Sequence, residues 1–133
     1  MMLFDDFVTE PKAPRPVLRP APLQAHPLVA GALHQLTYPL TAKARGLLIT
    51  VRGAGQSCVM ALRTQSMRPG QSYQAGFIAP ADWVTLNLPF FQFRPVGGVL
   101  RRLPRPEAIH SYGVIVDPDA TVQDLNIARL QFY

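Results

Sequence analysis

The amino-acid sequence predicts an all-β fold, an antiparallel β-sandwich. Short apolar runs alternate with turn signals rich in Gly, Pro and Asp along most of the chain, and helical periodicity is almost absent. Hydrophobic residues make up 48% of the sequence and charged residues 16%, which suits a globular core. With 133 residues, the chain corresponds to one domain that buries roughly two thirds of the surface that its unfolded form exposes.

The first 37 residues are predicted to form an N-terminal segment ahead of a sandwich domain at residues 38–133. Residues 11–27, PKAPRPVLRPAPLQAHP, hold six of the 14 prolines. Because proline fixes φ and lacks a backbone donor, we expect an extended polyproline arm here, with a disordered tail as the alternative. The following LVAGALHQL, residues 28–36, predicts a short helix with its leucines on one side.

The rest of the chain reads as strands bounded by turn residues. The predicted strands are residues 47–52, 58–64, 73–79, 83–88, 108–116 and 122–133. The sequence RGAGQSC lies between the first two strands and predicts a hairpin turn. A phosphate-binding loop is disfavoured, because the third glycine of that motif falls on Cys58 and a strand follows instead of a helix.

The sequence offers little that predicts catalysis or metal binding. The Asp-Pro-Asp at 117–119 predicts a turn more readily than a cation site, because no third ligand lies nearby in sequence. His26, His34 and His110 lack the spacing of a metal pair, and Cys58 is expected to be a small core residue. No catalytic triad or carboxylate pair can be named, so we expect a non-enzymatic protein without a cofactor.

The charge pattern predicts a binding surface. The net charge of +5 comes from 11 Arg and only 2 Lys against 8 acidic residues, with a dense basic group at Arg101, Arg102 and Arg105. The guanidinium fork suits carboxylates, phosphates and protein interfaces, so an acidic protein and an anionic lipid surface both remain open. Nucleic acid is not an expected partner, because no series of aromatic residues interleaves with the arginines.

The stretch DWVTLNLPFFQFRPVGG places three phenylalanines where a strand gives way to a loop. Their rings could plug the open end of the sandwich or serve as anchors in an interface, since aromatic and Arg residues are enriched at interface centres. We therefore predict partner-binding residues both here and on the proline-rich arm. The candidates are Pro14, Arg15, Pro16, Arg19 and Pro20 on the arm, and Phe90, Phe91, Phe93, Arg94, Arg101, Arg102 and Arg105 in the loop.

Several short motifs follow one another along the sequence. They are an acidic DDF start, a strand ending in R-G-x-G, an L-R-T strand, Y-x-x-x-F, the run W-x-x-x-x-L-P-F-x-x-F-x-P, and a late I-x-x-x-G. The positions that form them are Asp5, Asp6, Phe7, Arg52, Gly53, Gly55, Leu62, Arg63, Thr64, Tyr73, Phe77, Trp83, Leu88, Pro89, Phe90, Phe93, Pro95, Ile109 and Gly113. In this order, and over roughly residues 38–133, the sequence resembles the complex I intermediate-associated protein 30 family, and the resemblance implies a galactose-binding-like jelly roll.

The same comparison shows a departure near the N-terminus. Family members usually carry a tryptophan and a Met-Gly-Gly-Ser-like segment with further strands after the acidic start, where this chain has the proline-rich arm. We therefore expect a divergent, N-terminally shortened member in which one or two strands are lost or replaced.

The resemblance implies an interaction module that assembles or stabilises a membrane-bound energy-transducing complex, either respiratory complex I or a photosynthetic complex. The expected partners are subunits of that complex, with peripheral contact to anionic lipid. The start MMLFDDFVTE is acidic where a signal peptide would be basic, so we expect the protein on the cytoplasmic face of a bacterial inner membrane. The alternative is a carbohydrate-binding module of the same fold, which would stack sugars on exposed aromatic rings such as those of Trp83 or Tyr73.

Overall fold

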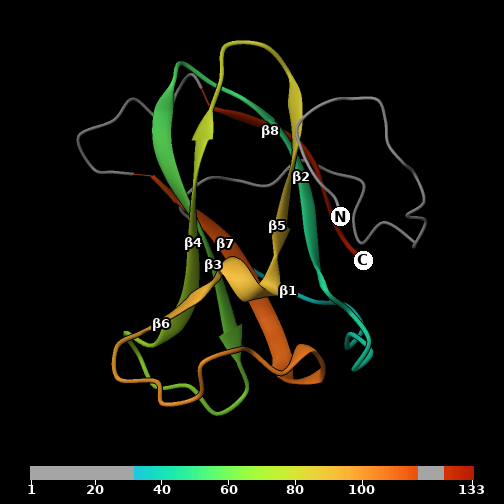
Figure 1. Cartoon of the computed structure of the whole chain (residues 1–133), viewed down its shortest axis with the longest axis vertical. Helices are drawn as coiled ribbons and strands as arrows, with labels where there is room; N and C mark the ends of the chain where they lie inside the picture. Colours follow the sequence, from blue (N-terminus) through green and yellow to red (C-terminus); the bar gives the residue numbers. More distant parts are fainter. Residues whose placement is uncertain (1–31, 117–124) are drawn as a thin grey trace.

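The computed structural model describes residues 32–116 and 125–133, which form two antiparallel sheets packed face to face (Figure 1). The five-stranded sheet has the order β1 (Leu33–Gln35), β7 (Ile109–Val116), β3 (Gln56–Thr64), β4 (Ser72–Ala79), β6 (Arg94–Val96). The three-stranded sheet has the order β5 (Val84–Pro89), β2 (Gly46–Arg52), β8 (Asn126–Phe132). Two short 3-10 turns complete the fold, η1 (Phe90–Gln92) and η2 (Pro106–Ala108). The predicted all-β sandwich is confirmed, and the proline-rich arm lies outside the described residues.

The core lies between the sheets and is built by the two-residue period of the strands. In β2, Leu47, Ile49 and Val51 are fully buried, while the residues between them are partly exposed. Alternate residues of β3 and β4 face them, including Met60 and Phe77. The predicted strand positions are therefore confirmed to within a few residues, since the apolar alternation that predicted them is what fills this core.

The helix predicted at residues 28–36 is wrong where the structure describes it. Leu33, His34 and Gln35 form β1, which pairs with Gly113, Tyr112 and Ser111 of β7. Gly113 permits the pairing, because a Cβ there would lie 2.6 Å from the carbonyl oxygen of Ala32. Pairing with an existing sheet thus outweighs the weak helical pattern, and the five-stranded sheet includes residues ahead of position 38.

The hairpin predicted at RGAGQSC is also wrong. Strands β2 and β3 belong to different sheets, so the turn at residues 53–55 carries the chain across the sandwich. Its backbone is tied to the neighbouring crossing between β4 and β5, through Gly53 N donating to Pro80 O at 2.6 Å and Gly55 N to Ala79 O at 2.7 Å. Gly55 has φ +85, a conformation that glycine adopts without strain. Turn chemistry therefore indicated a reversal correctly but could not show which sheet the next strand would join.

Candidate interaction surface

The phenylalanine-rich run after β5 forms a core plug with one ring left outside. Phe90 and Phe93 are 6% and 0% exposed, and their ring centroids lie 6.2 Å apart in an edge-to-face arrangement. Between them η1 makes a single tight turn in which Phe93 N donates to Phe90 O at 3.1 Å. Phe91, in contrast, is 67% exposed. Of the three candidate anchors, only Phe91 presents its ring at the surface.

The exposed ring belongs to one end of the sandwich, which we call the basic end. It comprises η1, β6 and the loops at residues 65–71 and 97–105, which lie in the lower half of Figure 1. The two loops touch: Gln71 Nε2 donates to Gly97 O at 3.1 Å, and Gly97, with φ +84, faces the Gly70 carbonyl so closely that a Cβ would clash. The far end of the sandwich holds the two sheet crossings described above.

The basic end carries a single sign of charge. Its arginines are all exposed, and none pairs with a carboxylate among the described residues; they are Arg68, Arg94, Arg101, Arg102 and Arg105. No acidic residue occurs in residues 65–71 or 90–106. The described part of the chain holds ten Lys or Arg and only two acids, Asp82 and Glu107. A uniformly positive surface of this kind attracts anionic partners.

Apolar side chains stand among these arginines. Leu100 is 98% exposed, and Leu103 and Val96 are 43% and 37% exposed. Together with Phe91 they give the basic end a mixed aromatic, aliphatic and guanidinium composition, which is typical of a binding surface.

The loop that carries Leu100 is anchored through its backbone. The buried Tyr73 hydroxyl donates to Arg101 O at 3.0 Å and lies 3.4 Å from Leu103 O, while Arg102 Nη1 donates to Phe93 O at 2.7 Å. Burial raises the pKa of Tyr73, against a smaller lowering by Arg101, so the hydroxyl remains a donor at neutral pH. The family motif included Tyr73, but no pattern in the sequence indicated that its hydroxyl orders the arginine loop.

The neighbouring loop is held in the same way. The Arg63 guanidinium donates to Gln71 O at 3.2 Å, Arg68 O at 2.9 Å and Met67 O at 3.4 Å. Arg63 is therefore a structural arginine that fixes the loop at residues 65–71. Both loops of the basic end thus start from an ordered conformation, which lowers the entropy cost of binding a partner.

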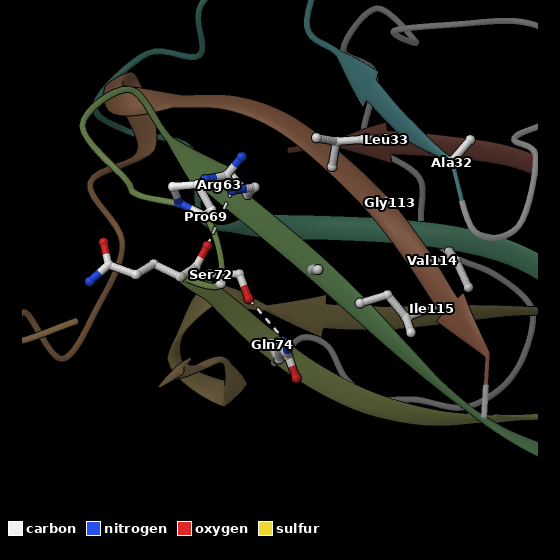
Figure 2. Close-up of a pocket in the computed structure, with 12 residues that line it drawn as sticks. Ala32, Leu33, Arg63, Pro69, Ser72, Gln74, Gly113, Val114 and Ile115 are labelled. Carbon is white, nitrogen blue, oxygen red and sulfur yellow. Dashed lines mark hydrogen bonds between the residues drawn. The ribbon is translucent and has the colours of Figure 1, made fainter. Parts of the chain in front are cut away.

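A groove lies on the outer face of the five-stranded sheet (Figure 2). This groove of about 380 Å³ has small residues such as Ala61 and Gly113 in its lining, together with Leu33, Ile115 and Gln74. Gln74 Nε2 donates to Ser72 Oγ at 3.0 Å, as Figure 2 shows. None of the residues that line the groove is aromatic, so it offers no ring on which a sugar could stack.

The aromatic residues named for sugar stacking lie elsewhere. Tyr73 is 2% exposed and points into the sandwich, where its hydroxyl anchors the arginine loop. Trp83 is 47% exposed, but its ring lies beneath the Arg52 guanidinium at 5.0 Å, in a cation–π contact. The two aromatic residues named for the carbohydrate alternative therefore give it no support.

The other residues named from the sequence form no further site in the described part of the chain. Cys58 is buried as expected, and burial raises its pKa. Within the described ranges no three His, Cys, Asp or Glu residues gather as metal ligands. The same ranges contain no helix with the length and hydropathy of a membrane span. The candidates that lie outside the described residues are Pro14, Arg15, Pro16, Arg19, Pro20, His26, Asp117 and Asp119.

The fold and this surface define a β-sandwich domain whose most prominent exposed feature suits binding to another molecule. The chain belongs to the complex I intermediate-associated protein 30 (CIA30) family, whose sequence model matches residues 34–124, more than half of the chain. The family resemblance is thereby confirmed. This is a family of assembly factors linked to complex I, which indicates an assembly-related role with membrane-complex subunits as partners. Comparisons with curated proteins and with solved structures give no match.

Proposed function

We propose that this protein is a non-enzymatic interaction module that assembles or stabilises a membrane-bound energy-transducing complex. Respiratory complex I is the first candidate partner and a photosynthetic complex the second, with the protein acting as an assembly factor or an accessory subunit. The observation that carries the proposal is the basic end, where exposed apolar side chains stand among arginines that pair with no carboxylate of the described residues, and where both loops are anchored. The family match supplies the class of partner.

Within the basic end, the binding role falls on side chains that are not used to hold the fold. Phe91, Arg94 and Arg105 are exposed, and these arginine side chains make no hydrogen bond with another described residue. Arg101 Nε donates to Leu103 O at 3.1 Å and keeps its charge at the surface. Phe90 and Phe93 contribute indirectly, because their burial sets the position of Phe91.

The proline-rich arm forms the second part of the proposal. Residues 11–27, including Arg15 and Arg19, would lie extended along the partner at low entropic cost, because polyproline is already ordered. Deletion of residues 8–27 should then release the protein from its complex while leaving thermal unfolding of the sandwich nearly unchanged. Intact binding after the deletion would rule out this role for the arm.

We place the module on the cytoplasmic face of a bacterial inner membrane, as a peripheral protein at the edge of the complex. Membrane fractionation with a high-salt wash tests this placement. Release of the protein from the cytoplasmic face by salt supports it, and recovery on the opposite side of the membrane would contradict it.

A tagged pull-down from gently solubilised native membranes tests the function. Stoichiometric recovery with a mature respiratory or photosynthetic complex identifies an accessory subunit, and recovery with a smaller subcomplex identifies an assembly factor. Arg105→Gln should weaken the recovery. The control is Arg129→Gln, which changes an exposed arginine on β8 in the three-stranded sheet and should leave the recovery unchanged. Recovery of no membrane-complex subunit would contradict the proposal.

A further inference from the structure

We propose that the basic end contacts anionic lipid directly, with Leu100 entering the bilayer interface and the surrounding guanidinium groups on the headgroup phosphates. This inference rests on the proposed function, because it names the molecule that the basic end touches when the protein is at the membrane. It adds anionic lipid as a second contact of this end of the sandwich, beside the subunit contacts that the proposed function gives to the same end and to the arm.

The first argument is the placement of Leu100. Its side chain is 98% exposed, more than that of any other large apolar residue among those described, so it contributes nothing to the core. It follows Gly97 and Gly98, both with positive φ, and is fixed on its other side by the Tyr73 hydroxyl at Arg101 O. An apolar side chain held out from the surface by an anchored loop is stabilised when it enters an apolar environment.

Aromatic and aliphatic neighbours extend this apolar tip. Phe91 is 67% exposed on η1, and Leu103 and Val96 are partly exposed beside the same loops. Aromatic rings favour the headgroup level of a bilayer, while aliphatic side chains reach toward the acyl chains. The aromatic and aliphatic side chains around Leu100 therefore suit the two depths of the bilayer interface, the headgroup level and the start of the acyl chains.

The second argument is the charge around the tip. Five arginines surround it without an acidic residue in either loop, and Arg94 and Arg105 have side chains that are not hydrogen-bonded to another described residue. Long cationic side chains of this kind reorient easily, keep their charge in the headgroup layer and bind phosphate oxygens with two parallel hydrogen bonds. A fluid layer of phosphates accepts such side chains in many arrangements, whereas a protein partner requires acids at fixed positions.

The third argument is the distribution of charge along the molecule. Of the two described acids, Asp82 belongs to the turn between β4 and β5, and that turn lies at the far end of the sandwich from the basic end (Figure 1). Glu107 lies in η2, directly after Arg105 at the same end as the arginine loop, where five arginines outnumber it. An anionic surface therefore attracts the basic end, with its five arginines, and orients the domain with that end toward the lipid.

The test uses the purified full-length protein and protein-free vesicles. Flotation is compared for phosphatidylcholine vesicles and for vesicles with about 30% phosphatidylglycerol, at low and at high NaCl. Binding is expected only to the anionic vesicles, with loss at high salt. Leu100→Ser should weaken binding about tenfold, the effect of withholding one leucine from an apolar environment. Ile78→Ser, which changes an aliphatic side chain 53% exposed on β4, is the matched control and should bind as the wild type does.

The charges are tested separately. Changing Arg94, Arg101 and Arg105 together to Gln removes three charges without touching the Arg102 anchor, and should weaken vesicle binding by about fivefold for each arginine. Thermal unfolding of each variant verifies that the fold is retained. No binding of the wild type to anionic vesicles, equal losses from Leu100→Ser and Ile78→Ser, or salt-independent binding to both vesicle types would each overturn the inference.

The vesicle assay and the pull-down, both done with the wild type, separate this inference from the proposed function. If the wild type fails to bind vesicles but still recovers complex subunits, the lipid contact is wrong and the assembly role stands. If it binds anionic vesicles as expected but recovers no subunits, the lipid contact stands and the assembly role is wrong.

Discussion

Replacing Tyr73 by phenylalanine tests how the arginine loop is held. The ring is 2% exposed and would stay packed, so the change removes only the hydroxyl that donates to Arg101 O at 3.0 Å. Leu103 O keeps a donor, because Arg101 Nε also binds it at 3.1 Å. The substitution therefore leaves one carbonyl group, that of Arg101, without its protein donor.

The size of the effect follows from this count. A neutral hydrogen bond contributes about 1 kcal/mol net, and water can replace the lost donor because Arg101 is exposed. We expect the free energy of unfolding to fall by about 1 kcal/mol and the melting temperature by roughly 4 °C. If the same change of about 1 kcal/mol acts on local opening of the loop, the fraction of molecules in which residues 97–105 are open rises about fivefold.

Hydrogen exchange with mass spectrometry measures the loop, and thermal unfolding measures the whole domain. Tyr73→Phe should speed exchange in residues 97–105 and weaken vesicle binding. The control is Thr85→Val, which removes the 2.8 Å contact between the Thr85 and Thr50 hydroxyls within the three-stranded sheet. It should change neither the exchange of residues 97–105 nor vesicle binding. Unchanged exchange in residues 97–105 would refute the assignment of the hydroxyl as the loop anchor.

The same variant has a pH signature. Burial makes Tyr73 hold its proton to a higher pH in the folded chain than in the unfolded chain, where its pKa is about 10. Its contribution to stability is therefore fully present below about pH 10 and is lost as pH rises through the folded pKa. Denaturant unfolding between pH 9 and pH 11 should show a smaller decline for Tyr73→Phe than for the wild type; equal declines would contradict the assignment.

Three further predictions concern packing, loop contact and the thiol. Phe93→Ala should lower the free energy of unfolding by about 3–5 kcal/mol and Phe91→Ala by less than about 0.5 kcal/mol, so similar urea midpoints would contradict the core assignment. Gly70→Ala should lower the free energy of unfolding by about 1–2 kcal/mol, because Gly70 has φ +85 but a Cβ there would meet no other atom. Gly97→Ala should lower it further, because its Cβ would also meet the Gly70 carbonyl, so the reverse order in thermal unfolding would refute the loop contact. The Cys58 thiol, 1% exposed with its pKa raised by burial, should react with a thiol reagent far more slowly in the folded than in the unfolded protein, and its stabilising contribution should be lost as pH rises above about 8.5.

The strands could be predicted because their pattern is local. In β4, Tyr73, Ala75, Phe77 and Ala79 alternate with more exposed residues, and that period is visible in the sequence before any partner strand is known. The edge strand β1 could not be predicted in this way, because its three residues take their conformation from β7. The same limit explains the wrong hairpin, since the choice between two sheets depends on long-range pairing.

The composition of the basic end was also visible in the sequence, but its geometry was not. A 3-10 turn has three residues per turn, which brings Phe90 and Phe93 to the same side and sends Phe91 to another. A sequence read as strand and loop contains no such period, so the three rings looked equivalent. The run that carries the family resemblance therefore has a physical role: its two phenylalanines close the core, and by closing it they fix the position of the one ring that can meet a partner.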